Sequence, residues 1–110
     1  MAYGLSLVVG LAALLATGLA QAADDGTATY NTSCAGCHAE SGAGDTAIGK
    51  TIGVPDLRSS QVQSQPDSRL TDVIVNGTGR MPPFKSTLSD AQVKLIVAHV
   101  RALAKAGSGG

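Results

Sequence analysis

The chain has 110 residues, enough for one domain and too few for two of ordinary size. Eight lysines and arginines balance eight aspartates and glutamates, and no long basic face is present, so nothing predicts binding to nucleic acid. Aromatic residues make up only 3% of the chain, although such residues normally supply much of the buried area of a small core. A domain this short therefore needs additional stabilisation from a disulfide, a metal or a cofactor.

The N-terminal segment is set apart from the rest of the chain. Residues 3–20 carry no charge and end in Ala20-Gln21-Ala22, an A-x-A cleavage pattern. We therefore expect residues 1–22 to be a secretory signal peptide that is cut after Ala22. The alternatives are an uncleaved membrane anchor, because the run is near the roughly 17 residues that a span needs, and a buried core helix. With a signal peptide or an anchor, the domain lies outside the cytoplasm.

Residues 23–106 form the predicted domain. A first helix is expected from Asp24 to Ser33, with Gly26 and Tyr30 on one face because they lie four residues apart. Residues 39–65 are rich in Gly, Ser, Thr and Gln and are predicted to be a long loop. A loop of that length is acceptable in a compact domain if it wraps a large ligand.

Two further helices are predicted toward the C-terminus. The first opens at Pro66-Asp67-Ser68 and ends with Gly77 as its C′ residue, and the prolines and glycines of residues 77–84 exclude a helix after it. The S-x-x-Q capping box at Ser89 opens the last helix, whose apolar residues recur at helical spacing up to Ala104. Residues 107–110 are predicted to be a disordered tail. No strand pattern is found, so the fold class is all-α.

The motif that carries the chemistry is Cys34-Ala35-Gly36-Cys37-His38, a C-x-x-C-H sequence. On one helical turn, two thiols three residues apart reach the two vinyl groups of a porphyrin edge, and the imidazole that follows points beneath the ring toward the iron. The motif therefore predicts one haem c, bound covalently through Cys34 and Cys37. Such a cofactor also supplies the core that the side chains lack.

Three other interpretations of the cysteine pair compete with haem attachment. A disulfide between residues three apart closes a very small loop and contributes little stability. A thioredoxin-like redox pair needs a βαβ context, which is absent. A zinc site lacks a second cysteine pair, and His99 is the one other histidine.

The axial position opposite His38 decides what a haem iron does. Beyond the signal segment Met81 is the only methionine, and it lies between glycines that allow close backbone approach and prolines that stiffen the loop. Met81 is therefore the favoured ligand. The alternatives are that Met81 fills a gap in the core, that His99 is the ligand, or that the iron keeps an open position for gas binding or catalysis.

Residues 24–105 resemble a small bacterial class I cytochrome c. The resemblance rests on the C-x-x-C-H motif, Val54-Pro55-Asp56-Leu57, Asn76-Gly77-Thr78-Gly79-Arg80-Met81-Pro82-Pro83-Phe84 and the last helix around Ile96–Leu103. It implies the fold of that class, with three or more short helices and a long loop wrapped around one haem c.

The resemblance also implies roles for individual residues. His38 and Met81 would be the axial ligands, and the Pro55 carbonyl would accept the proton of His38 Nδ1. Leu57 would pack on the ring. Where the first and last helices cross, Gly26 and Tyr30 would meet His99, which stands at a position that is commonly Tyr or Trp in the family.

A haem with two axial side chains has no vacant site for a substrate. We therefore expect a periplasmic single-electron carrier, not an enzyme, that acts as a monomer and docks redox proteins at the exposed haem edge. It would bind no small-molecule substrate and would meet a membrane only through partner complexes or an uncleaved N-terminal segment. The alternatives are a haem-bearing electron-transfer subunit of a dehydrogenase or oxidase complex, and a haem sensor or enzyme with a labile sixth ligand.

Charged residues near the predicted ligands are candidates for the docking surface. Arg80, Lys85 and Lys50 are expected around the haem edge, and Arg58 is expected to face a haem propionate. Because the formal net charge is +0, association with partners should depend only modestly on salt.

Overall fold

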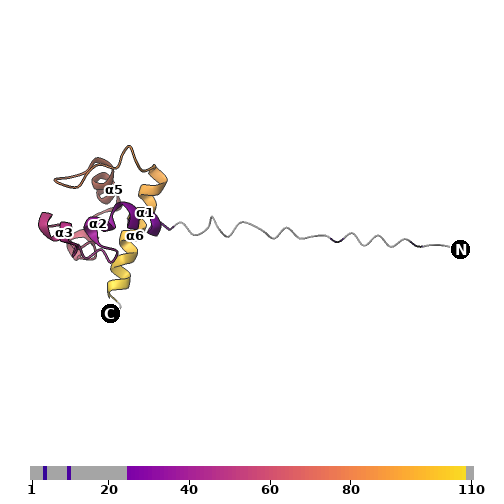
Figure 1. The fold of residues 1–110 in the computed structure, drawn as a ribbon, viewed down its shortest axis with the longest axis horizontal. Coiled ribbons are helices and arrows are strands. Elements are labelled where there is room, and N and C mark those ends of the chain that lie inside the picture. The colour runs from indigo at the N-terminus through magenta and orange to yellow at the C-terminus, as the bar shows by residue number, and fades with distance from the viewer. Residues whose placement is uncertain (1–3, 5–9, 11–24, 109–110) are drawn as a thin grey trace.

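The computed structural model describes residues 25–108, together with Gly4 and Gly10. Residues 25–108 contain six helices and, in this described stretch, no named strand; one isolated bridge joins Thr78 and Met81 (Figure 1). The all-α prediction is confirmed. The helices are α1 Thr27–Ser33, α2 Ala35–His38, α3 Ala47–Ile52, α4 Ser60–Gln63, α5 Asp67–Asn76 and α6 Asp90–Ser108.

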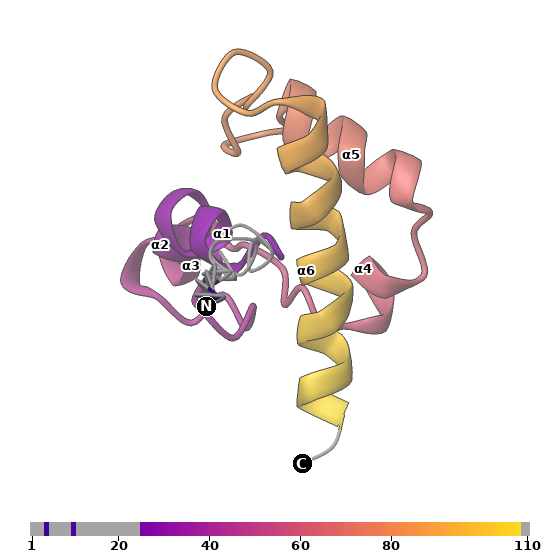
Figure 2. The same ribbon diagram turned by 90° about the vertical axis from the view of Figure 1, so that its right-hand side faces the viewer.

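Helix α6 is the axis of the domain. Figure 2 shows α1, α2 and α3 on one side of it and α4 and α5 on the other. The predicted capping box opens this helix: the Ser89 N–H donates to Gln92 Oε1 at 2.8 Å, and the Gln92 N–H donates to Ser89 Oγ at 3.1 Å. The reciprocal pair satisfies two backbone donors that the first helical turn would otherwise leave unpaired.

The core is small and almost wholly aliphatic. Half of its buried side chains come from α6, and one aromatic ring is among them. Because Tyr30 is the one aromatic ring among these buried side chains, the core fits the predicted need for a cofactor to complete the interior. The buried residues are Tyr30, Val62, Leu70, Ile74, Val93, Ile96, Val97 and Val100.

Helices α1 and α6 cross at Gly26 and Tyr30, as predicted. Gly26 has φ +89°, and a Cβ atom added there would lie 2.6 Å from the carbonyl oxygen of Leu95. Only glycine allows this approach of the two backbones. One turn later, the Tyr30 ring packs against the His99 ring with a centroid distance of 4.6 Å.

The prediction of a long loop over residues 39–65 is wrong in part, because α3 and α4 lie within it. Each is opened by a hydroxyl cap: Thr46 Oγ1 accepts from the Gly49 N–H at 2.9 Å, and Ser59 Oγ accepts from the Val62 N–H at 3.4 Å. Helices of six and four residues are too short to display a repeating apolar pattern. In the sequence, only the two capping residues indicated that helices begin here.

The C-terminal end of α5 was predicted correctly, whereas α6 extends further than expected. Helix α5 ends at Gly77 as expected, with φ 74° and its N–H bonded to the Val73 carbonyl at 2.8 Å. Helix α6 includes Gly107 and Ser108, which we expected in the disordered tail. The backbone at Gly107 lies against Arg58: a Cβ added there would be 3.1 Å from Arg58 Cδ.

The remaining terminal predictions lie outside the described residues. These are the signal peptide, residues 1–22 apart from Gly4 and Gly10, and the last two glycines of the tail. Among the helices that the structure describes, none combines the length and the apolar character needed to cross a membrane.

Candidate functional site

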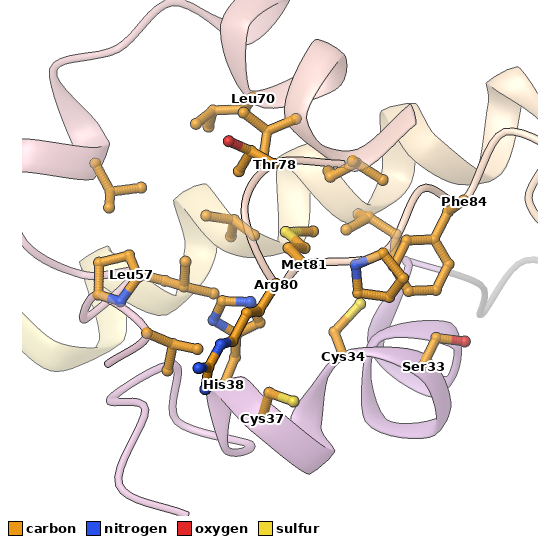
Figure 3. Close-up of a pocket in the computed structure, with 18 of the residues that line it drawn as sticks. Ser33, Cys34, Cys37, His38, Leu57, Leu70, Thr78, Arg80, Met81 and Phe84 are labelled. Atoms are coloured by element: carbon orange, nitrogen blue, oxygen red, sulfur yellow. The ribbon is translucent and has the colours of Figure 1, made fainter. Parts of the chain in front are cut away.

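A cavity of about 420 Å³ lies beside the core, lined mainly by apolar side chains. All four predicted site residues, Cys34, Cys37, His38 and Met81, line it although Met81 is distant in sequence. Figure 3 shows the first three on the α1–α2 segment and Met81 on the loop that follows α5. Cofactor sites in proteins are typically apolar cavities of roughly 300–1,000 Å³ with a few polar groups, which is the character of this one.

The C-x-x-C-H motif occupies the junction of α1 and α2. Cys34 stands between the two helices, and its carbonyl accepts from the His38 N–H at 3.0 Å, which closes the turn of α2. The turn brings both thiols and the imidazole to the same cavity, as the spacing predicts. Both cysteines are free and partly buried.

The Cys34 thiol does not have the character of a reactive thiol in a redox pair. Burial, and then the neighbouring Cys37, raise the pKa of the Cys34 thiol to about 11. Reactive dithiols have a lowered pKa instead, because the thiolate is the nucleophile. In the described part of the chain, no three His, Cys, Asp or Glu side chains are grouped so that they could hold a metal ion, which leaves the zinc interpretation without ligands.

The His38 imidazole lines the cavity. Burial lowers its pKa, which favours the uncharged ring that binds metals. Its Nδ1 atom is buried and has no hydrogen-bond partner, so the expected bond to the Pro55 carbonyl is not formed. That segment packs on Gly44 instead: a Cβ added at Gly44 would lie 3.2 Å from the Val54 carbonyl oxygen and 3.5 Å from that of Pro55.

Met81 is held by a tight turn. The Met81 N–H donates to the Thr78 carbonyl at 2.8 Å, and the Thr78 N–H donates to the Met81 carbonyl at 3.1 Å. Gly77 starts the turn at φ +74°, where an added Cβ would lie 2.6 Å from the Met81 carbonyl oxygen. The Phe84 N–H then bonds the Ile74 carbonyl of α5 at 2.9 Å. The loop is thereby anchored at both ends, and the thioether lines the cavity from a defined backbone.

His99, the rival ligand, does not line the cavity. Besides packing on Tyr30, its Nδ1 lies 3.4 Å from Thr27 Oγ1, and its Nε2 is buried without a partner. His99 therefore belongs to the crossing of α1 and α6.

The similarity of this chain to known proteins supports the interpretation of the cavity as a haem site. Residues 21–100 match the model of the family described as cytochrome C oxidase, cbb3-type, subunit III. The chain belongs to this family of c-type cytochromes. The Cbb3-type cytochrome c oxidase subunit CcoP of Azospirillum brasilense is 34% identical over 86 residues, which are 76% of this chain and 29% of that protein.

Two further relatives are named cytochrome c6. The one from Synechocystis sp. is 32% identical over 98 residues, covering 89% of this chain and 79% of that protein. The one from Leptolyngbya boryana is 29% identical over 85 residues, covering 74% and 93%. The protein is thus a small monohaem c-type cytochrome, its cofactor is covalently bound haem c, and it carries electrons.

The cavity of this cytochrome fits haem c. Two free thiols, an imidazole and a thioether line one mainly apolar cavity. These are the donor types that haem c proteins use for attachment and for axial ligation.

The positively charged side chains that line the cavity match the expectation only in part. Arg80 lines it as predicted, whereas Lys50 and Lys85 do not. Arg58 does not line it either. Its guanidinium donates to both carboxylate oxygens of Asp56, at 2.9 and 3.0 Å, and these bonds hold the pKa of Asp56 below its usual value. Nothing in this arrangement supports the expected contact of Arg58 with a propionate, because Arg58 does not line the cavity and its guanidinium is bonded to Asp56.

Arg69 of α5 lines the cavity and was missed by the sequence analysis. It lies four residues before Val73, which also lines the cavity, so the two share one helical face. This four-residue spacing is the sequence feature that could have placed Arg69 at the cavity. Arg69 and Arg80 are the two cationic residues that could meet the carboxylates of the cofactor.

The residue after His38 has an unusual backbone in this cytochrome. Ala39 has φ 67° and ψ 157°, and among the described residues it is the one non-glycine with positive φ. This region is essentially reserved for glycine, and occupying it costs on the order of 1–3 kcal/mol. The Ala39 carbonyl accepts from the Tyr30 hydroxyl at 2.7 Å, and burial raises the pKa of Tyr30 to about 12, so the hydroxyl remains a donor.

Proposed function

We propose that this cytochrome is a periplasmic electron carrier and not an enzyme, with haem c attached at Cys34 and Cys37 and with His38 and Met81 as axial ligands. The observation that carries the proposal is the convergence of all four side chains on one cavity from two separate segments. When bound, haem c supplies an iron that alternates between the ferrous and ferric states. An iron with both axial positions taken has no place for a substrate.

The chain's own residues would tune and protect this centre. A methionine thioether favours the reduced iron and so raises the reduction potential. The apolar lining excludes water, and a surrounding of low polarity disfavours the additional charge of the ferric form. The anchored turn around Met81 and the helical turn around His38 hold both side chains in place, which keeps rearrangement between oxidation states small.

Docking of redox proteins is proposed at the edge of the cavity, where Arg80 is exposed. The balanced charge of the chain favours partners that are not strongly charged. The predicted signal peptide supports a periplasmic location, and we propose a monomer.

The spectrum of the haem-loaded protein with and without carbon monoxide tests the ligation. We expect a low-spin ferrous spectrum that ignores carbon monoxide and a ferric spectrum with the weak far-red band of sulfur-to-iron ligation. Met81→Ala should lose the band and bind carbon monoxide, whereas Val73→Ala, which alters another cavity side chain, should do neither. Prompt binding of carbon monoxide by the wild type would instead favour a sensor or an enzyme.

The second candidate function is that of an electron-transfer subunit in an oxidase complex. The matching family model and the CcoP relative support it, although the chain spans only 29% of that relative. Mild detergent extraction from the native host separates the two candidates. A free carrier should elute at the mass of one chain, whereas a subunit should co-elute with a membrane oxidase.

A further inference from the structure

Asn76 and Gly77 form an Asn-Gly pair at the point where α5 ends. Asn76 is exposed, and Gly77 has no Cβ that would shield the main-chain nitrogen next to the Asn76 side chain. That nitrogen can therefore reach the side-chain amide carbon, Cγ of Asn76. The chain contains one other asparagine, Asn31, and the branched residue Thr32 follows it. Asn76 is thus the asparagine whose neighbour leaves the amide open to attack by the main chain.

The reaction of such a pair needs water as its only co-reactant. A bond forms between the Gly77 nitrogen and Asn76 Cγ, and the bond from Cγ to the side-chain nitrogen breaks. That nitrogen leaves as ammonia and takes the proton of the Gly77 N–H. Water then opens the succinimide ring at one of its two carbonyls. The products are aspartate and isoaspartate, and in isoaspartate the main chain runs through the side chain and is longer by a carbon atom.

Two hydrogen bonds in the last turn of α5 restrain this reaction. Asn76 Nδ2 donates to Asp72 Oδ1 at 2.8 Å, which holds the amide against the helix. The Gly77 N–H donates to the Val73 carbonyl at 2.8 Å, which occupies the attacking nitrogen. Both bonds belong to the end of a helix, where local opening is easiest. The folded protein therefore slows the reaction without preventing it, and the Asp72 carboxylate is one of the two restraints.

The same pair forms the base of the turn that carries Met81. A Cβ added at Gly77 would lie 2.6 Å from the Met81 carbonyl oxygen and 2.9 Å from the Pro83 nitrogen. Backbone is packed there without spare room, so a longer main chain at Asn76 must displace the turn. The new carboxylate would also lie opposite Asp72, which accepts from the amide in the unmodified protein, and like charges four residues apart destabilise a helix.

We propose that Asn76 is a site of spontaneous covalent modification, restrained by Asp72, and that isoaspartate at this position withdraws the Met81 side chain from the haem iron. The second step rests on the proposed ligation by Met81, whereas the first step does not. The modified protein has an open axial position in place of the thioether and binds carbon monoxide.

Incubation of the holoprotein in warm, mildly alkaline buffer tests the first step. Mass spectrometry of proteolytic peptides measures conversion at each asparagine, and enzymatic methylation detects isoaspartate. Asn76 should convert faster than Asn31. Asp72→Ala should raise the rate at Asn76 about fivefold, which is the effect of removing one hydrogen bond. Asp45→Ala removes an exposed carboxylate before α3 and should leave that rate unchanged. If Asn76 converts no faster than Asn31, or if Asp72→Ala has no more effect than Asp45→Ala, the inference is wrong.

The far-red band of the ferric protein tests the second step. Its absence at the start of the incubation would refute the proposed ligation, and with it the second step only. In the wild type the band should fade in proportion to the isoaspartate formed. Asn76→Gln keeps an amide but cannot close the five-membered ring, so its band should persist. Freshly prepared Asn76→Asp carries the charge of the products on an unaltered backbone and should also keep the band. Fading in Asn76→Gln, or an intact band in protein that contains isoaspartate, would overturn the link to Met81.

Discussion

The hydroxyl of Thr46 donates a hydrogen bond of 2.8 Å to the carbonyl oxygen of Cys37, the second cysteine of the attachment motif. The hydroxyl oxygen of Thr46, Oγ1, also accepts from the Gly49 N–H at 2.9 Å and so caps α3. One side chain therefore satisfies a carbonyl in the last turn of α2 and a donor in the first turn of α3. The short helix α3 is fastened to the attachment motif by this bridge.

Thr46→Ala should lower the free energy of unfolding by about 1–2 kcal/mol, because a cap is lost and the Cys37 carbonyl loses its donor. Thr46→Ser, which keeps the hydroxyl, should retain most of that free energy. Denaturant unfolding of the holoprotein measures both. Thr51→Ala is a matched control on the same helix, since its hydroxyl bonds only the exposed Ala47 carbonyl, and it should change stability by less than about 0.5 kcal/mol. Equal losses for the two alanine variants would contradict the role of the bridge.

Gly49→Ala should destabilise the protein although alanine is the better helix former. A Cβ at this buried position would collide with the Cys37 carbonyl and would lie 2.5 Å from the Gly44 carbonyl oxygen. Both obstacles are backbone atoms, so we expect a net loss of about 2 kcal/mol in the free energy of unfolding. Gly36→Ala is the control: it is exposed with no heavy atom within 4 Å, and it should be neutral or stabilising by up to about 1 kcal/mol. Similar values for the two variants would show that α3 does not pack tightly on the motif.

Sequence reasoning succeeded where one residue type imposes a local geometry. The capping box at Ser89 and the terminal Gly77 were predicted because each satisfies backbone groups of its own helix. The cysteine spacing was predictive for the same reason, since one helical turn determines where both thiols lie. Met81 was proposed as a ligand by elimination, because no other methionine was available beyond the N-terminal segment, and it lines the cavity.

It failed where a side chain or a short segment could make more than one contact and the sequence does not show which one it makes. Asp56 lies two residues before Arg58, but the sequence does not show that its carboxylate binds the guanidinium in preference to the cavity. The helices α3 and α4 are held by caps and by packing, so a search for apolar repeats passes over them. The strain at Ala39 and its bond to Tyr30 arise only when α1 and the end of α2 are brought together.

Arg101 joins α6 to the segment between α4 and α5, and its loss should be costly. Its guanidinium donates to the carbonyls of Gln63 at 3.0 Å and Gln65 at 2.6 Å, and to the carboxylate of Asp67 at 2.8 Å. Arg101→Met leaves these carbonyls without their donor, so we expect a loss of about 2–3 kcal/mol in chemical denaturation.

Asp67→Asn is the matched variant for Arg101. The Asp67 side chain is 73% exposed, so removing its charge should cost less than about 1 kcal/mol. If Asp67→Asn proves as damaging as Arg101→Met, the ion pair and not the bonds to the carbonyls would be the main contribution.

Arg69 and Arg80 should influence the reduction potential because both line the cavity. A nearby positive charge disfavours the ferric state, so Arg69→Gln and Arg80→Gln should each lower the potential. Arg69 is 54% exposed and paired with Asp72 at 3.0 Å, so its effect is screened. An interaction of about 0.5 kcal/mol between an exposed charge and the haem iron would change the reduction potential of this one-electron couple by about 20 mV. Arg80 has no ion pair recorded among the described residues and should give the larger shift.

Spectroelectrochemical titration at low and high salt measures these potentials. Lys94→Gln removes a charge of the same sign from the exposed face of α6, outside the cavity lining, and should leave the potential unchanged. High salt should shrink the shift for Arg69→Gln more than that for a charge close to the cofactor. If Lys94→Gln lowers the potential as much as Arg80→Gln does, the effect is that of overall charge, and neither arginine acts on the haem at close range.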